Sequence, residues 1–577
     1  METKGKSLSR RDFLKGASAG AVGVAAAGLM GGCAPAVGTP TPEPTEAPIV
    51  PTSDACEPWY GTAPEIADAD IAETVETEIL ICGAGHTGMI SALVAAEQGA
   101  KTLVIEKNPT VGTIRTYVGA IGTKAQNAAG VEIDKNEIVA DMARYGSNHV
   151  DQKLIRVWAD ESAETVDWLA DHMAEYGITH VSEYDTGTGY HGIYKCWATH
   201  TKFVGGQEGA TDAMGSVAPS VEKKAKELGA EFRFSTPLVK LIREGDNDRV
   251  TGAIASTTDG KYIKINASKA VLICTGGYAD DQALFTQLNP CAASVTTFSW
   301  VQPGATADGI KAGIWAGGVK DKHTAAMLFD RGITVPGGKA GVPFKKGGFQ
   351  DIFNMGSQPF MKVNMDGKRY CCESTPYDFS LYPLENEKNG VFCMIWDANY
   401  WANMESFHTM GCSRMVPSPS VPATGEGMGE EATEQLISGL SQAGLIQQAD
   451  TLEELATKLM LPPDAFKATV ERYNELAAAG VDEDFGKPAK DLFSLNAPPF
   501  FGATIGGWVL TTMDGLRINT DMQVLDEDFN IIEGLYAAGD TAGGFFAHNY
   551  PELAVGVACG KSMTFGRHAV LHALGKI

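Results

Sequence analysis

The chain is poor in positive charge. Its 46 Lys and Arg face 71 Asp and Glu, which gives a formal net charge of -25, and it contains no long run of basic residues. A nucleic-acid-binding surface needs concentrated positive charge, and so does binding to an anionic membrane. We therefore expect neither partner. The acidity favours simple solubility over an acidic face that docks a basic protein such as a cytochrome.

Cysteine motifs are also missing. The 11 cysteines are scattered, only Cys371 and Cys372 are adjacent, and neither CxxC nor CxxCH occurs. Zinc ribbons, cysteine-rich iron–sulfur sites and covalent c-type haem are disfavoured by this pattern, and we expect no metal. Most cysteines are expected to be small core residues, for example Cys82 and Cys274 in apolar segments.

The amino terminus lacks an apolar run suited to a permanent membrane span. Residues 9–15 read SRRDFLK and precede a short Gly/Ala-rich stretch, which resembles a twin-arginine signal. We interpret 1–34 as this signal, which sends the chain to the periplasm or the cell surface. The LMGG segment before Cys33 leaves two alternatives, a lipid anchor at Cys33 or peptidase cleavage near Ala36.

Residues 35–69 are rich in Pro and Thr at their start, a composition that cannot build a core and favours extended geometry. We interpret this segment as a linker that spaces the enzyme from a membrane or wall. Twin-arginine export carries folded proteins, so the signal independently predicts a cofactor inserted before export.

A β-α-β unit follows the linker. The apolar segment 77–82 predicts a strand, GAGHTG follows at once, an apolar helix comes next, and KTLVIEK predicts a second strand. Gly83 permits the tight turn, Gly85 admits the pyrophosphate and Gly88 lets helix and strand pack closely. Glu106 ends the second strand, where it can accept hydrogen bonds from a ribose. We therefore expect FAD at this loop.

Two later apolar strands fit the same domain. The segment 270–281 breaks at Thr275 and Gly276, and 534–544 breaks at Asp540. An antiparallel hairpin is expected just before the first of them. No second Gly-rich unit suggests an NAD(P)H site, so we expect electrons to come from a haem or quinol-linked protein.

From about Thr77 onward the chain resembles the FAD-dependent fumarate reductase, urocanate reductase and 3-oxosteroid dehydrogenase superfamily. The segments that carry the resemblance are GAGHTG, VLICTGGY, GATADGIKAG, VNMDGKRYCCE, TTMDGLRINT and IIEGLYAAGD. The resemblance implies an α/β fold, with a Rossmann-type FAD-binding domain built from 70–319 and 498–577. An inserted α+β capping domain would occupy 320–497.

The resemblance also implies where FAD is contacted. Besides the glycine loop, the matching positions are Thr87, Glu106, Arg115, Gly119, Ala120, Val239, Asp308, Asp540, Val555 and Gly556.

The substrate positions depart from the fumarate reductases. The resemblance places Tyr377, Thr511 and Tyr550 where those enzymes carry an acid arginine, a histidine and a carboxylate-binding arginine. A dicarboxylate cannot be desolvated without paired positive charge. Fumarate is therefore an improbable substrate, and a neutral or singly charged one is expected.

The two tyrosines match the 3-oxosteroid dehydrogenase branch instead. There one tyrosine exchanges a proton with the carbon beside a ketone, and the other hydrogen-bonds the carbonyl oxygen. Glu552 and Ala554 replace glycines of that branch. The carbonyl pocket is therefore altered, and the resemblance does not imply a steroid substrate. Thr511, His548 and Glu552 are candidate substrate contacts, although an ordinary loop role is favoured for His548 over a proton relay.

The sequence thus predicts an FAD-dependent reductase of a small molecule with an activated C=C bond, an enone or enoate. FAD would give the hydride, Tyr377 the proton and Tyr550 a hydrogen bond to the developing enolate. Two alternatives stay open. One is a dehydrogenase that oxidises a ketosteroid-like substrate, and the other is a flavin carrier without catalysis.

Overall fold

The computed structural model describes residues 58–183, 190–191, 194–207, 213–347, 352–407, 409, 413–417 and 429–577. The predicted signal, Cys33 and most of the linker lie outside the described residues. The chain divides into two units, Met1–Pro58 and Trp59–Ile577, and the following concerns the second unit. Among the described helices, none combines the length and the apolar character needed to cross a membrane.

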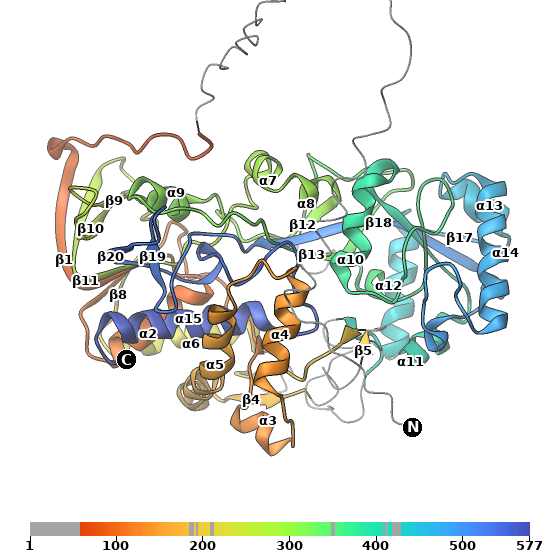
Figure 1. The fold of residues 1–577 in the computed structure, drawn as a ribbon, viewed down its shortest axis with the longest axis horizontal. Helices are drawn as coiled ribbons and strands as arrows, with labels where there is room; N and C mark the ends of the chain where they lie inside the picture. Colours follow the sequence, from red (N-terminus) through yellow and green to blue (C-terminus); the bar gives the residue numbers. More distant parts are fainter. Residues whose placement is uncertain are drawn as a thin grey trace, which may run out of the picture. The chain divides into compact units, whose positions relative to one another are not determined.

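An eight-stranded sheet forms the cofactor domain (Figure 1). Its main path runs β19 (Gln523–Leu525), β20 (Ile531–Ala537), β11 (Tyr262–Ile273), β1 (Ile71–Cys82), β2 (Thr102–Ile105) and β8 (Glu231–Arg233). β1 pairs in parallel with both β2 and β11. The apolar ends of these strands are buried, as expected for parallel strands covered on both faces.

Antiparallel strands extend this sheet. β10 (Gly252–Ser256) pairs with β11 and with β9 (Leu238–Ile242). The β10–β11 pair is the predicted hairpin. The strand β20 pairs in parallel with β11, so the carboxyl-terminal part of the chain closes the sheet that the amino-terminal part begins. The prediction of a cofactor domain built from both ends is confirmed.

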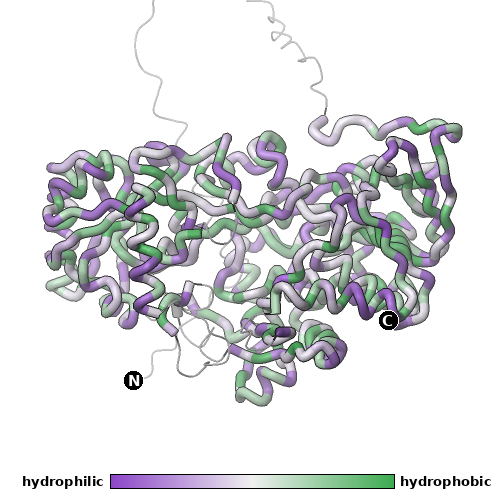
Figure 2. Tube along the Cα trace, turned by 180° about the vertical axis from the view of Figure 1, so that it is seen from behind, coloured by the Kyte–Doolittle hydropathy of each residue, from purple (hydrophilic) through white to green (hydrophobic). Residues whose placement is uncertain are grey.

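Helices cover the sheet on the side where the chain ends (Figure 1). α2 (His86–Glu97) packs against α15 (Val557–Ala573) and α6 (Met214–Glu227). Ten of its 12 residues are buried, and such a helix, apolar nearly all round, belongs in a core. Figure 2 shows hydrophobic residues along the chain close to the C-terminus. α5 (Gln152–Met173) lies against α15 and α4 (Lys135–Tyr145).

A second, seven-stranded sheet is centred on β18 (Phe500–Thr512). Four other strands pair directly with β18. They are β12 (Thr296–Ser299), β13 (Ala326–Thr334), β16 (Phe392–Trp396) and β17 (Ile446–Ala449). β15 (Met361–Val363) and β14 (Lys345–Lys346) complete the sheet.

The limits of this sheet differ from the predicted capping limits of 320–497. β12 precedes the predicted region and β18 follows it. The long strand β18 holds the sheet together, because four strands depend on it for backbone hydrogen bonds. Its far end reaches the cofactor domain, where the Thr512 hydroxyl accepts a hydrogen bond from the Tyr278 amide at 2.9 Å.

Four helices pack around the second sheet: α11 (Tyr400–Phe407), α12 (Gly429–Gln442), α13 (Leu452–Lys458) and α14 (Pro463–Ala479). α13 and α14 form a separate small core with β15 and β16, whereas the buried apolar residues of α11 and α12 belong to the main core. Aromatic side chains of 396–407 lie in the main core: Trp396 stacks on Phe501 with ring centroids 5.8 Å apart, and Phe407 meets Phe360 at 5.1 Å. These residues stabilise the cap.

The remaining elements are short. A three-stranded sheet joins β3 (Tyr117–Gly119), β7 (His200–Gly205) and β4 (Ile178–Ser182), and β5 (Tyr190–His191) pairs with β6 (Tyr194–Lys195). The short helices are α3 (Lys124–Ala128), α7 (Gln282–Leu288), α8 (Pro290–Ser294), α9 (Asp308–Trp315) and α10 (Tyr377–Leu381). Among the described cysteines none forms a disulfide, and Cys82 and Cys274 are buried, as predicted.

Candidate active site

The structure contains a cavity of about 520 Å³, whose wall is formed by residues of the two sheets and of the loop before α15. Both groups of predicted residues contribute to its wall. From the cofactor set they are Gly83, Gly85, Thr87, Glu106, Arg115, Thr275, Gly276, Asp308, Asp540, Val555 and Gly556. From the substrate set they are Tyr377, Thr511, Tyr550 and Glu552.

The glycine loop has the geometry that a dinucleotide needs. Gly83 has φ +105°, and a Cβ there would lie 2.4 Å from the carbonyl oxygen of Cys274. A Cβ on Gly88 would lie 1.9 Å from the carbonyl oxygen of Gly83, so this glycine lets α2 pack on β1. At Gly85 a Cβ would meet nothing within 4 Å. The cavity side of Gly85 is therefore open to a ligand.

Glu106 lies at the end of β2, where the ribose of a dinucleotide is held in this fold. Its Oε2 accepts a hydrogen bond from the Ala84 amide at 2.7 Å, and its Oε1 accepts one from the Asn108 amide at 2.8 Å. Each carboxylate oxygen can accept a second hydrogen bond. Glu106 thus fixes the glycine loop and still offers an acceptor to the ribose.

Two helices begin at the cavity wall. α2 begins directly after Gly85, and α15 begins directly after Gly556, which has φ +76°. Free amide groups and the helix dipole make such ends favourable for anionic groups. The residues present therefore fit FAD: the start of α2 would hold the pyrophosphate, and the start of α15 offers a second set of donors.

Four predicted cofactor contacts fall outside the lining residues in the described part of the chain: Gly88, Gly119, Ala120 and Val239. Gly119 supports Gly556, because its amide donates to the Gly556 carbonyl at 2.7 Å. Thr236 and Leu238 line the cavity beside Val239. Contacts of these four residues with FAD stay predictions.

Asp540 is half-buried and lines the cavity. Burial raises the pKa of its carboxyl group, against the nearby positive charge of Lys561. Burial also lowers the pKa of Lys561 to about 8. The Thr511 hydroxyl donates to Asp540 Oδ2 at 2.7 Å. Thr511, which was predicted to contact the substrate, is thus already engaged with a predicted cofactor residue.

The two predicted catalytic tyrosines share one end of the cavity. Tyr377 is the first residue of α10, and Tyr550 lies on the loop before α15. Both side chains are buried. The ring of Phe329 lies near both, with its centroid 4.5 Å from that of Tyr377 and 6.5 Å from that of Tyr550. The structure thus brings together two residues that the sequence places far apart.

Two buried carboxylates fix the main chain of these tyrosines in a reciprocal manner. Asp378, which follows Tyr377, accepts a hydrogen bond from the Tyr550 amide at 3.0 Å. Glu552, close after Tyr550, accepts one from the Tyr377 amide at 3.0 Å. Glu552 was predicted to contact the substrate, and the structure shows that it also positions Tyr377.

Asp378 lies in an unusual electrostatic environment. Burial is the main cause that raises the pKa of its carboxyl group to about 7, and the nearby Glu552 adds to the effect. The Tyr145 hydroxyl donates to its Oδ1 at 2.9 Å and acts in the opposite direction.

Two arginines at the substrate end of the cavity were not predicted from the sequence. Arg331 on β13 and Arg414 line the cavity and are largely buried. The Arg331 guanidinium lies 5.3 Å from the ring centroid of Tyr377, and its Nε donates to the Ser357 hydroxyl at 2.8 Å. Arg414 Nη2 lies 3.7 Å from a carboxylate oxygen of Glu183. The cavity therefore contains cationic side chains at its substrate end that were not predicted from the sequence.

His548 is the one predicted substrate residue outside the cavity wall as described. Its amide donates to the Thr324 carbonyl at 2.7 Å, and its ring lies beside those of His149 and His323. The prediction of a substrate contact is therefore not supported by the position of its side chain.

The reciprocal contacts generate a pH prediction. The pKa of Asp378 is about 7 in the folded state and near 3.8 in the unfolded chain. At a pH between these two values, the folded state therefore binds the proton more tightly than the unfolded chain does. Its stability should therefore fall as pH rises from about 4 to 7. Asp378→Asn should flatten this fall in thermal denaturation scans. An unchanged pH dependence would show that Asp378 does not titrate in this interval.

Sequence comparison gives named relatives that match most of the chain. The chain is 28% identical over 506 residues to vinyl phenol reductase of Lactiplantibacillus plantarum, which covers 85% of this chain and 96% of that protein. It is 26% identical over 508 residues to a probable fumarate reductase of Shewanella frigidimarina, with 87% and 76% covered. It is 25% identical over 595 residues to a 3-oxosteroid 1-dehydrogenase of Mycobacterium tuberculosis, with 86% and 98% covered.

Solved structures share the fold. A flavocytochrome c3 fumarate reductase in its open conformation superposes with a TM-score of 0.62 at 24% identity and covers 88% of this chain and 79% of its own. A 3-ketosteroid Δ1-dehydrogenase from Sterolibacterium denitrificans gives 0.64 at 18% identity, with 87% and 100% covered. The model of the FAD binding domain family matches residues 78–557. Together with the cavity that fits FAD, this match shows that the chain belongs to the FAD binding domain family and is an FAD-dependent oxidoreductase.

Proposed function

We propose that the protein is an exported reductase that saturates a C=C bond conjugated to a carbonyl or carboxylate group. The observation that carries this proposal is that Tyr377 and Tyr550 line the same cavity as the residues that fit FAD. When bound, FAD supplies the hydride. The residues of the chain must then supply a proton for the neighbouring carbon and stabilise the charge that develops on the substrate oxygen.

Tyr377 is suited to give the proton. Its side chain is buried, and the Arg331 guanidinium lies 5.3 Å from its ring centroid. A positive charge in a largely dry site stabilises the phenolate that remains after proton transfer. Tyr550, held by Asp378 through its amide, is suited to donate a hydrogen bond to the carbonyl oxygen.

The charges around the cavity limit the charge of the substrate. Arg331 and Arg414 are cationic, but Glu552 is a lining carboxylate and Glu183 lies close to Arg414. One substrate carboxylate can be paired at such a site, whereas two would leave a buried charge uncompensated, at a cost of several kcal/mol. We therefore retain a neutral or singly charged substrate.

The wall near the tyrosines is otherwise apolar. Met327, Phe329, Trp508 and Leu510 line it, and the Phe329 and Trp508 rings lie 5.2 Å apart. A hydrophobic or aromatic body fits this wall better than a compact polar acid. The names of two relatives, vinyl phenol reductase and 3-oxosteroid 1-dehydrogenase, support the same class of substrate.

The tyrosine pair also favours a second candidate function. The same groups working in reverse would remove hydrogen from a ketosteroid-like substrate and pass electrons to an acceptor. Assays with reduced viologen and a panel of enones and enoates separate the two functions. Reduction of one or more enones or enoates supports our proposal, whereas turnover only in the oxidative direction supports the dehydrogenase.

The first prediction concerns the proton donor. Tyr377→Phe removes one hydroxyl and should lower kcat by 10²-fold or more, because general acid catalysis contributes about 10²–10⁴-fold. FAD absorbance and thermal stability should stay close to those of the parent protein. Tyr262→Phe, on β11 in the cofactor sheet, is the matched control. Full turnover of Tyr377→Phe would disprove the role and favour a non-catalytic flavin carrier.

The second prediction concerns substrate charge. Arg331→Gln keeps a polar side chain but removes the cation beside Tyr377. If Arg331 pairs with a substrate carboxylate, KM for an enoate should rise by roughly 10- to 100-fold, since hydrogen bonds to charged groups are worth about 1.5–3 kcal/mol. KM for a neutral enone of the same shape should change much less. An equal change for both substrates would show that Arg331 does not recognise the carboxylate.

The third prediction concerns location and electron supply. We propose export through the twin-arginine route and an electron donor that carries haem or oxidises quinol. Replacing Arg10 and Arg11 by Lys should leave the FAD-loaded protein in the cytoplasm, as cell fractionation would show. Export of this variant at the parent level would refute the signal, and turnover with NADH alone would refute the donor.

A further inference from the structure

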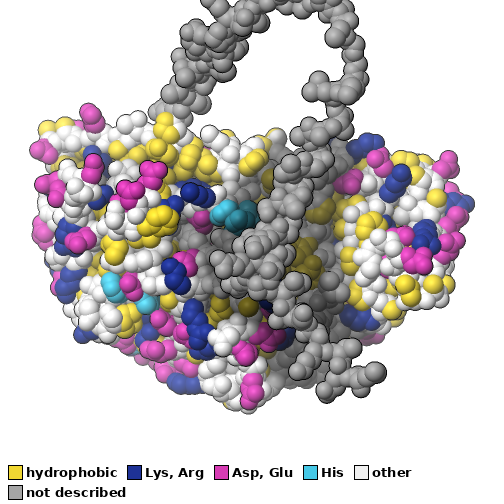
Figure 3. All heavy atoms as spheres, in the orientation of Figure 1, with side chains coloured by type: hydrophobic (Ala, Val, Ile, Leu, Met, Phe, Trp, Pro, Cys, Tyr) yellow, Lys and Arg dark blue, Asp and Glu magenta, His cyan; other side chains and the backbone are white. Residues whose placement is uncertain are grey.

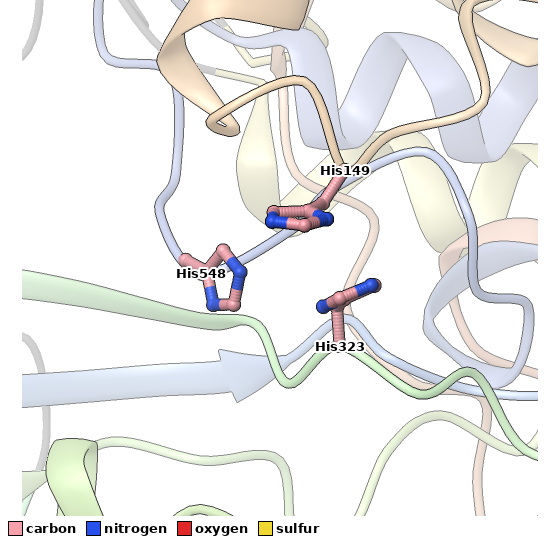
Figure 4. Close-up of side chains that lie close together, drawn as sticks. All are labelled: His149, His323 and His548. Atoms are coloured by element: carbon pink, nitrogen blue, oxygen red, sulfur yellow. The ribbon is translucent and has the colours of Figure 1, made fainter. Parts of the chain in front are cut away.

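Three histidines from distant parts of the chain meet at the surface beside the Tyr550 loop. His149, His323 and His548 each have a ring nitrogen within 4.8 Å of those of the other two (Figure 4). His149 is exposed and the other two are half-buried. In Figure 3, one group of histidine side chains lies near the middle of the visible face, apart from other histidines seen there.

The backbone fixes this cluster. His548 has φ +61°, a left-handed conformation that is uncommon for a residue other than glycine. Its amide donates to the Thr324 carbonyl at 2.7 Å. Asp321 accepts hydrogen bonds from the amides of His323 at 3.2 Å and Gly544 at 2.6 Å. One carboxylate thus ties two of the three histidine segments together.

Ring stacking alone does not account for this arrangement. The His149 and His323 rings are stacked with centroids 4.2 Å apart, but His548 meets both rings edge-on, at 5.3 and 5.2 Å. This orientation turns ring nitrogens of three imidazoles toward a common space (Figure 4).

We propose that His149, His323 and His548 form a site for a divalent first-row transition ion, with Zn²⁺ as its expected occupant. Three neutral imidazoles are a known ligand set for Zn²⁺, which keeps its fourth position open to water. Zn–N bonds of about 2.0–2.1 Å require ligand nitrogens somewhat closer together than the widest pair here.

This site revises the expectation of no metal that followed from the cysteine pattern. It also gives His548 a role, because its side chain lies outside the cavity wall. The Tyr382 hydroxyl donates to the His548 carbonyl at 3.0 Å, and Tyr550 follows closely in sequence. An ion would therefore tie the loop that carries Tyr550 to two other segments of the chain.

The test uses the full FAD-loaded chain without a histidine tag. After dialysis against a chelator, the protein is titrated with Zn²⁺ by calorimetry and with Co²⁺ by visible absorption. We expect one equivalent to bind with a Kd in the micromolar range or below, with tetrahedral Co²⁺ bands. The double variant His149→Ala/His323→Ala should weaken binding at least tenfold and abolish these bands.

The matched control is His172→Ala/His572→Ala, which removes two histidines that lie elsewhere beside Glu97 and Asp521. This variant should bind the ion like the parent protein. If the first double variant loses FAD, the single exposed substitution His149→Gln takes its place. Absence of binding at 100-fold molar excess of Zn²⁺, or equal affinity in the cluster variant and its control, would overturn the proposal.

Discussion

Two buried carboxylates hold the catalytic end of the molecule together. Asp378 binds the amide of Tyr550, and Glu552 binds the amide of Tyr377, each at 3.0 Å. Neither tyrosine can move without straining the segment that carries the other. Because α10 packs on the second sheet and Tyr550 precedes a helix of the cofactor domain, this reciprocal pair also fixes the cap against the residues that fit FAD.

The segment before Tyr377 is anchored deep in the cap. Arg369 binds Glu373 and Asp482 with both its Nε and Nη groups, at 2.8 to 3.0 Å, and Lys487 lies 3.6 Å from Glu373. Removing one partner from such a buried set leaves a charge uncompensated. Rigid support on the cap side and the reciprocal carboxylates together give the preorganisation that proton transfer requires.

Local chemistry explains what could be predicted from the sequence. The loop Gly83–Gly88 and Glu106 follow one another within a single β-α-β unit, so their roles can be worked out from neighbouring residues. Arg331 and Arg414 carry no such signal: one lies within an ordinary strand and the other in an irregular segment, and only the tertiary fold brings them to Tyr377. The three histidines are equally far apart in sequence. The predicted cap limits stay a prediction, and the pairing of β18 with the second sheet could not be predicted because its partner strands lie far away in the sequence.

The central claim is that Tyr377 faces the carbon that receives the proton. A crystal structure of the protein with FAD and a saturated product of an accepted enoate tests this most directly. Our account predicts the Tyr377 hydroxyl within roughly 3.5 Å of the carbon beside the carboxylate, with Tyr550 or Arg331 on a carboxylate oxygen. A product bound with that carbon turned away from both tyrosines would contradict it.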